Sequence, residues 1–169
     1  MAQVTYESPV YHRLREVIRD KIEEGEYPLC SAIPSESEMA EYYGEMFGIA
    51  PEDEIYYIKR VCYANGEPVS LEEIYVPQYV IPKMGGIDLS VFSVYEIYGI
   101  YGVNLQRAEQ ELYLVHLDQK DARVLGIDTS LPVMNFESIS YDETGRVVEF
   151  NRNYVRGDKC NFTVHFRNI

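Results

Sequence analysis

The sequence predicts an α+β protein in which two N-terminal helices precede a mostly antiparallel sheet that carries further helices on one side. Three observations support this fold class. Helical spacing and a capping signal mark the first 44 residues, β-rich segments dominate after residue 53, and turn residues join most of those segments as hairpins. A chain of 169 residues is long enough for one domain and a small appendage.

The first helix is predicted between Pro9 and Gly25, because proline suits the first turn of a helix and glycine suits the position after its end. Its apolar face comprises Leu14, Val17, Ile18 and Ile22. A second helix is predicted to begin at the capping box of Ser35 and Glu38 and to end near Tyr43-Gly44. On periodicity alone, this could simply be a pair of helices that pack against a core.

The first two long strands are predicted at residues 54–63 and 68–76, as a hairpin around an Asn65-Gly66 turn. A three-residue loop, residues 65–67, is preferred over a two-residue loop because it keeps four apolar side chains on one face. Those side chains are Val61, Tyr63, Val69 and Leu71. The opposite face then carries Ile58, Arg60, Cys62, Ser70, Glu72 and Ile74.

The remaining elements follow from caps and β-rich runs. A capping box of Ser93 and Glu96 predicts a short helix, whose first-turn N–H groups and Ser93 hydroxyl would favour an anion. Residues 118–125 predict another short helix, which Gly126 stops. The other strands are predicted at residues 107–116, 132–141, 146–155 and 159–166.

Acidic residues outnumber basic residues in this chain, 28 against 15, and the net charge is −13. Residues 1–44 contain four Lys and Arg against nine Asp and Glu, which gives a local net charge of −5. Non-specific affinity for DNA comes mainly from cationic contacts with phosphates. The N-terminal segment as it stands is therefore not expected to bind DNA.

Residue spacing argues against several other functional classes. No apolar run is long enough to span a membrane and the N-terminus lacks a secretory signal pattern, so we expect a cytoplasmic protein without a membrane partner. The three cysteines and three histidines lack metal-site spacing, so neither a metal nor another cofactor is expected. No nucleophile–base pair can be named, so we do not expect an enzyme.

The N-terminal segment resembles the start of a known DNA-binding domain. The most specific motif is Pro34-Ser35-Glu36 before a short helix that ends in Tyr43-Gly44. Further shared residues are Pro9, Tyr11, Ile22, Gly25, Tyr27 and Met39-Ala40. Together they resemble the winged helix-turn-helix of GntR-type bacterial transcription regulators, but the recognition helix and the wing are missing by comparison. We therefore assign residues 1–45 to a partial winged helix-turn-helix.

A second resemblance covers nearly all of residues 47–166. Its motifs are Ile58-Lys59-Arg60, residues 64–69, Leu71-Glu72, Tyr75-Val76-Pro77, residues 93–96, residues 122–126, Tyr141-Asp142, Gly145-Arg146, Val148-Glu149 and Arg156-Gly157-Asp158. In this order they resemble the UTRA effector-binding domain of the HutC branch of GntR regulators, to which we assign residues 46–169. The resemblance implies a chorismate-lyase-like α+β fold, a ligand cleft against the sheet and a homodimer.

The same resemblance implies five effector-binding residues, Arg60, Glu72, Ser93, Tyr95 and Glu149. The first two correspond to effector contacts on the central hairpin, the next two to the start of an anion-binding helix, and the last to a carboxylate that accepts a sugar hydroxyl. Each has an alternative role that remains open. The hairpin pair can be a plain cross-strand ion pair, Ser93 can act only as a helix cap, and Glu149 can face solvent.

Two positions depart from the family pattern. Cys62 stands where many sugar-phosphate sensors have a second arginine, and Val155 stands where an aromatic residue is common. The first departure removes a bidentate partner for phosphate, so the expected small-molecule effector is either a sugar phosphate or an organic acid.

Three functions remain open. The first is a ligand-responsive GntR/HutC transcription regulator that binds a small anionic metabolite and dimerises, with operator DNA as a partner only if the missing segment is present. The second is a shortened sensing and dimerisation protein that does not bind DNA. The third and weakest is a lyase-like enzyme, because shared fold alone does not supply function.

Overall fold

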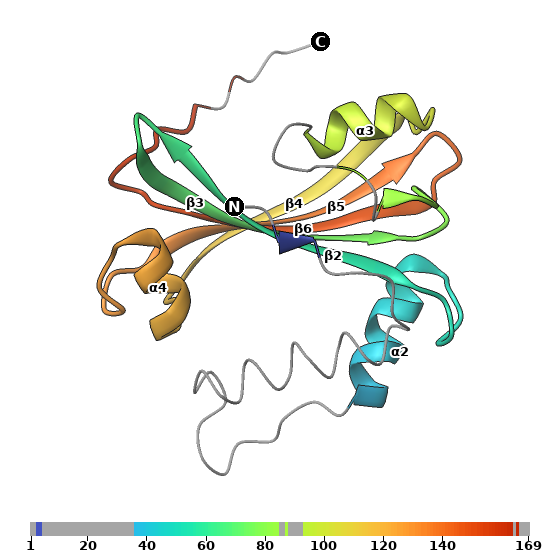
Figure 1. The fold of residues 1–169 in the computed structure, drawn as a ribbon, viewed down its shortest axis with the longest axis horizontal. Coiled ribbons are helices and arrows are strands. Elements are labelled where there is room, and N and C mark those ends of the chain that lie inside the picture. The colour runs from blue at the N-terminus through green and yellow to red at the C-terminus, as the bar shows by residue number, and fades with distance from the viewer. Residues whose placement is uncertain (1–2, 5–35, 85–86, 88–92, 164, 166–169) are drawn as a thin grey trace.

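The computed structural model describes residues 3–4, 36–84, 87, 93–163 and 165 (Figure 1). The helix predicted between Pro9 and Gly25, and the Ser35 cap of the second helix, lie outside the described residues. The structure is α+β, as the sequence predicts, and the described helices are α2 (Glu36–Phe47), α3 (Val94–Ile100) and α4 (Gln119–Leu125).

A six-stranded sheet in the order β1-β2-β3-β6-β5-β4 forms the centre of the fold, and its neighbouring strands pair antiparallel. The strands are β1 (Gln3–Val4), β2 (Ile55–Ala64), β3 (Glu67–Pro77), β4 (Leu105–Val115), β5 (Val133–Asp142) and β6 (Val147–Val155). Sequence analysis therefore predicts the antiparallel character and most strand positions correctly. Among the described residues 159–163 and 165 there is no strand, so the last strand that was predicted is wrong there.

Helices cover both faces of the sheet, which corrects the expectation of helices on one side. Helix α3 lies over one face, and α2 and α4 lie over the other (Figure 1). We call these the α3 face and the α2/α4 face. Strand β3 explains the difference, because the whole run from Leu71 to Pro77 is buried. A strand buried on both sides needs cover on both sides.

Alternate residues of β3 belong to different parts of the core. Ile74 and Val76 pack with Ile97 and Tyr98 of α3. Tyr75 packs with Tyr43 and Phe47 of α2 and with Phe150 of β6. A third cluster joins Leu71 to Ala122 and Leu125 of α4. The period of two along a strand thus sends neighbouring side chains into separate clusters.

The β2–β3 hairpin has the predicted register but not the predicted loop. Arg60 lies opposite Glu72 and Cys62 lies opposite Ser70, as the three-residue loop would require. The loop itself has two residues, Asn65 and Gly66, with φ values of 52° and 81° that suit a tight hairpin turn. A bulge after Cys62 leaves Val69 without an opposite residue and restores the register.

Two helix predictions differ in outcome. Helix α4 lies within the predicted residues 118–125 and ends at Gly126, whose φ is 66°, and the structure shows Asp118 as its N-cap. Helix α2 does not end near Tyr43-Gly44 but continues to Phe47, so it crosses the boundary predicted after residue 45. Gly48, with a φ of 62°, follows its last residue. Apolar contacts with the sheet explain the longer helix, since Tyr43 and Phe47 are both buried against it.

Candidate functional site

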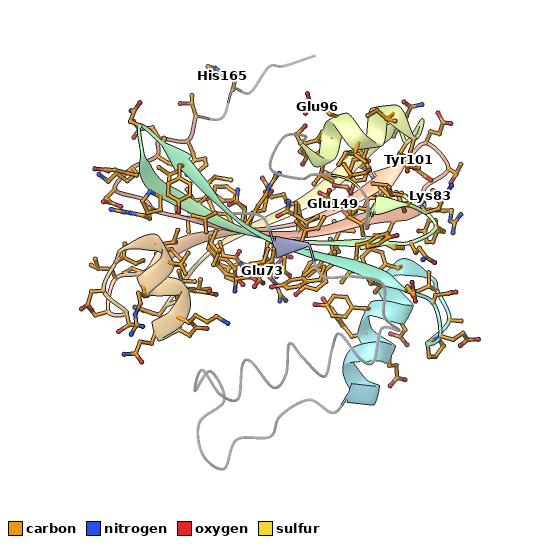
Figure 2. The ribbon with its side chains drawn as sticks, in the orientation of Figure 1. Glu73, Lys83, Glu96, Tyr101, Glu149 and His165 are labelled. Atoms are coloured by element: carbon orange, nitrogen blue, oxygen red, sulfur yellow. The ribbon has the colours of Figure 1, made fainter. Side chains whose placement is uncertain are left out.

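Polar side chains gather on the α3 face at the level of the predicted site. The paired register of β3, β6 and β5 places Glu72 opposite Asn153, and Glu149 opposite Ser140. Along β6, Glu149, Asn151 and Asn153 alternate with residues of the other face. Figure 2 shows Glu149 between α3 and the sheet, whereas Glu73 lies on the other side of the sheet. A partly buried polar surface thus lies beneath and beside α3.

Arg60 and Glu72 form an ion pair at the edge of this surface. The Arg60 Nε atom lies 2.5 Å from Glu72 Oε2, and Asn151 Nδ2 donates a hydrogen bond of 2.9 Å to Glu72 Oε1. The side chains of Arg60 and Glu72 are only 20% and 10% exposed. The pair is therefore more than an exposed surface contact, because both carboxylate oxygens have partners and little water reaches them.

Glu149 lies at the centre of the surface and is 1% exposed. Tyr98 of α3 donates a hydrogen bond of 2.7 Å to Glu149 Oε2. Burial raises the pKa of Glu149 from its ordinary 4.5 to about 7, against the opposing effects of Tyr98, Asn151 and Arg60. Nearby Glu72 adds to the rise. The folded protein therefore holds the proton of this carboxyl group more tightly than an unfolded chain does.

Three buried oxygens on this face have no hydrogen-bond partner. They are Glu149 Oε1, Asn151 Oδ1 and Asn153 Oδ1. Buried polar atoms nearly always form hydrogen bonds with protein or water, so three unsatisfied acceptors on one face need an explanation. Oxygen acceptors of this kind are satisfied by hydroxyl or N–H donors.

Ser93 and Tyr95 stand at the start of α3. The Ser93 hydroxyl accepts a hydrogen bond of 3.1 Å from the Glu96 N–H, and the Ser93 N–H donates one of 2.7 Å to Glu96 Oε2. The capping box predicted from the sequence is therefore confirmed, and the Glu96 carboxylate lies beside the first turn of the helix. This contact with Ser93 lowers the pKa of Glu96.

Tyr95 is half-exposed, and its surroundings link it to the polar surface. Burial raises the pKa of Tyr95 most, and the charges of Glu149 and Glu72 raise it further. The charge of Arg60 lowers it. The structure therefore brings four of the five predicted residues together: Arg60, Glu72, Tyr95 and Glu149. Ser93 has a clear role as a helix cap, and its recorded side-chain hydrogen bond is with Glu96.

Sequence analysis missed Tyr98, Asn151 and Asn153. The asparagines carried a usable signal, because Glu149, Asn151 and Asn153 place a polar group at every second position of an otherwise buried strand. Tyr98 gave no sequence signal of a site, since a tyrosine at helical spacing from Val94 suits a core position as well as a site position.

A separate polar network lies on the α2/α4 face. Lys59 Nζ lies 2.8 Å from Asp121 Oδ2 and 3.3 Å from Glu73 Oε1, and the Tyr57 hydroxyl donates to Glu73 at 2.9 Å. Burial alone would lower the pKa of Lys59, but the two carboxylates outweigh it and the pKa is raised. This network ties α4 to the central hairpin.

Other kinds of site find no support in the described part of the chain. It contains no group of three or more His, Cys, Asp or Glu side chains that could hold a metal ion. No helix there is long and apolar enough to cross a membrane. Cys62 and Cys160 are free thiols, and Cys62 lies opposite Ser70 on the α3 face.

Comparisons with known proteins point to one family. The UTRA domain model matches residues 32–161. The mannosyl-D-glycerate transport/metabolism system repressor MngR of Escherichia coli is 27% identical over 124 residues, which cover 73% of this chain and 52% of that protein. The chain spans about half the length of the curated relatives it matches.

Solved structures share the fold. The crystal structure of the effector domain of PhnF from Mycobacterium smegmatis superposes with a TM-score of 0.72 at 23% identity, covering 76% of this chain and 79% of that one. A GntR-family transcriptional regulator from Enterococcus faecalis gives a TM-score of 0.66 at 24% identity, covering 79% of this chain and 92% of that one.

The proteins matched here are named as transcription regulators, in agreement with the expectation that this chain is not an enzyme. Because the family model spans most of the chain and the fold agrees with it, the chain belongs to the UTRA domain family found in GntR-type transcription regulators.

Proposed function

We propose that this chain is the ligand-sensing part of a bacterial transcription regulator of the GntR/HutC type, acting in the cytoplasm as a homodimer. A small, hydroxylated, anionic metabolite binds on the α3 face. The observation that carries this proposal is the group of three unpartnered, buried acceptors, Glu149 Oε1, Asn151 Oδ1 and Asn153 Oδ1, beside the Arg60–Glu72 pair.

The donors and acceptors at the site define the chemistry of the ligand. Three unpartnered oxygens call for hydroxyl or amine donors, which favours a polyol or a sugar. Arg60 uses Nε for Glu72, and its terminal nitrogens remain suitable for an anionic group. Cys62 lies on the same face, at the position where many sugar-phosphate sensors have a second arginine. Without that second arginine, the site suits a carboxylate better than a phosphate.

The name of one relative supports this class of ligand. The name of MngR refers to mannosyl-D-glycerate, which combines many hydroxyl groups with a single carboxylate. We carry over only that combination of groups, because this chain spans about half of that protein and 27% of the aligned residues are identical.

The ligand proposal is tested by a panel of sugars, sugar acids, sugar phosphates and organic acids in thermal-shift and calorimetric titrations. A ligand present at 100 times its dissociation constant stabilises the fold by about 2.7 kcal/mol. Asn153→Ala removes an acceptor that has no protein partner, so we expect the ligand-free protein to keep its stability and to bind the active ligand about tenfold more weakly.

Asn135→Ala is the matched control for that experiment. Asn135 also has an unpartnered buried Oδ1, but it lies opposite Tyr154 on the α2/α4 face. This variant should bind the ligand like the wild type, whatever its effect on stability. Equal loss of affinity in the two variants would place the binding site elsewhere.

The alternative function is a shortened protein that senses and dimerises but does not bind DNA. We expect the purified chain to bind neither generic nor operator duplexes at physiological salt, because residues 1–44 carry a net charge of −5 and, by the sequence resemblance, are not followed by the recognition helix of the family. Fluorescence anisotropy at two salt concentrations measures this. Salt-dependent binding with sub-micromolar affinity would restore the DNA-binding function to this chain.

A further inference from the structure

A compact block of polar side chains lies on the α2/α4 face of strands β6, β5 and β4. In the paired register it forms two rows of three: Arg152, Glu137 and Glu111, then Tyr154, Asn135 and Tyr113. On β5, Val133 packs in the cluster below α4, and Ile139 packs against the cluster below α2. The block, which we call the Asn135 block, therefore lies between two apolar clusters.

Asn135 forms the buried floor of the Asn135 block. Its side chain is 2% exposed, and its Oδ1 atom has no hydrogen-bond partner in the structure. Both of its cross-strand neighbours on this face, Tyr154 and Tyr113, are tyrosines. A buried amide oxygen is nearly always paired, so an N–H or O–H donor is missing at the floor of the block.

The charges of the block favour a cation as the missing donor. Glu137 Oε2 accepts hydrogen bonds from the Tyr113 hydroxyl at 2.9 Å and from Arg152 Nε at 2.8 Å. Glu111 lies directly opposite Glu137 on β4, and no cation among the described residues is recorded as its partner. Like charges directly opposite each other destabilise a strand pair. A cation between the two carboxylates would remove that repulsion.

Aromatic rings border the block on its exposed side. Tyr113 is 40% exposed, and Tyr42 of α2 is 48% exposed. Burial raises the pKa of Tyr42 most, Glu137 raises it further and Arg152 lowers it, so the Tyr42 hydroxyl lies near that ion pair. Tyrosine rings attract cations over their faces. A planar guanidinium can stack on such a ring while its N–H fork reaches a carboxylate.

We propose that the Asn135 block is a second binding site, which takes a small guanidino compound on the face of the sheet opposite the proposed effector site. The guanidinium lies between Glu111 and Glu137, donates hydrogen bonds to a carboxylate and to Asn135 Oδ1, and stacks on the Tyr113 ring. The described residues contain no group of three or more side chains that could hold a metal ion, so an organic cation suits the block better. This inference goes beyond the anionic effector and does not depend on it.

The site is tested by an NMR titration of the full chain with methylguanidinium at physiological salt. A protein with a net charge of −13 attracts any cation to its surface. Tetramethylammonium is therefore the control ligand, because it carries the same charge and has no N–H donor. We expect saturable binding of methylguanidinium, with shifted signals of the Asn135 side-chain amide, and no saturable binding of tetramethylammonium.

Two variants test the contacts of the guanidinium. Asn135→Ala removes the buried acceptor and should weaken methylguanidinium binding about tenfold, because a hydrogen bond to a charged group is lost. Glu111→Gln changes an exposed carboxylate, keeps the fold and should weaken binding by up to about fivefold. Asn153→Ala is the matched control, since it removes an unpartnered buried oxygen on the α3 face, and it should bind methylguanidinium like the wild type.

The two asparagine variants thus exchange roles between this experiment and the effector experiment. Loss of methylguanidinium binding in Asn135→Ala and Glu111→Gln, but not in Asn153→Ala, supports the second site. No binding of methylguanidinium, equal binding of tetramethylammonium, or unchanged affinity in Asn135→Ala overturns it, and a buried water molecule then explains the Asn135 oxygen. Each of these outcomes leaves the effector proposal for the α3 face unchanged.

Discussion

Glu149→Gln should remove a pH dependence of stability that the wild-type protein shows between about pH 4.5 and 7. Burial raises the pKa of Glu149 from 4.5 to about 7, so the folded state holds this proton more tightly than the unfolded chain does. Stability from this group is therefore fully present below pH 4.5 and is lost as the pH rises through 7. The loss amounts to about 3 kcal/mol, at 1.36 kcal/mol for each unit of pKa.

Denaturant unfolding at pH 4 and pH 8 measures the effect. Glutamine keeps an oxygen that can accept the Tyr98 hydroxyl, so we expect Glu149→Gln to match the wild type at pH 4 and to exceed it by up to about 3 kcal/mol at pH 8. Glu109→Gln, on an exposed carboxylate, is the control and should change little at either pH. A difference between Glu149→Gln and wild type that does not vary with pH would contradict the assignment.

Phe47→Ala should lower the free energy of unfolding by about 3–5 kcal/mol, the usual cost of truncating a buried phenylalanine. Phe47 is 3% exposed and lies in the aromatic cluster that joins α2 to Tyr75 and Phe150. The rings of Tyr43 and Tyr75 stack 4.9 Å apart in the same cluster. Helix α2 is therefore expected to unfold with the sheet.

Tyr42→Ala is the control on the same helix. Tyr42 is 48% exposed and its ring meets that of Tyr43 edge-on at 5.2 Å between centroids, so its removal should cost about 1 kcal/mol or less. Urea denaturation followed by far-UV circular dichroism compares the two variants. If Phe47→Ala costs no more than Tyr42→Ala, α2 contributes little to the stability of the sheet.

The parts of the fold that depend on neighbouring residues in the chain were predictable from the sequence. Ser93 with Glu96 at the start of one helix, and Gly126 at the end of another, are short-range signals, and both caps are present in the structure. The register of the hairpin was also predictable, because burial penalises a slip at Val61 and Leu71. Its loop was predicted wrongly because a bulge and a longer loop produce the same register.

The parts that depend on packing between distant segments were not predictable in the same way. The sequence from Leu71 to Val76 does not reveal whether one or two layers of helices cover it, and the helices proved to lie on both faces. Of the candidate site, Arg60, Glu72, Tyr95 and Glu149 came from family resemblance. Tyr98 reaches Glu149 across 51 positions of sequence, a separation that no local pattern encodes.

The open oxygen of Glu149 has a thermodynamic consequence for binding. A ligand hydroxyl that donates to Oε1 favours the ionised carboxyl, so association near neutral pH expels part of a proton into the solution. The heat of association then includes the ionisation heat of whichever buffer accepts that proton. For the proposed hydroxylated ligand, we therefore expect affinity to rise with pH until Glu149 is fully ionised in the free protein, and binding would then depend on pH as well as on the ligand concentration.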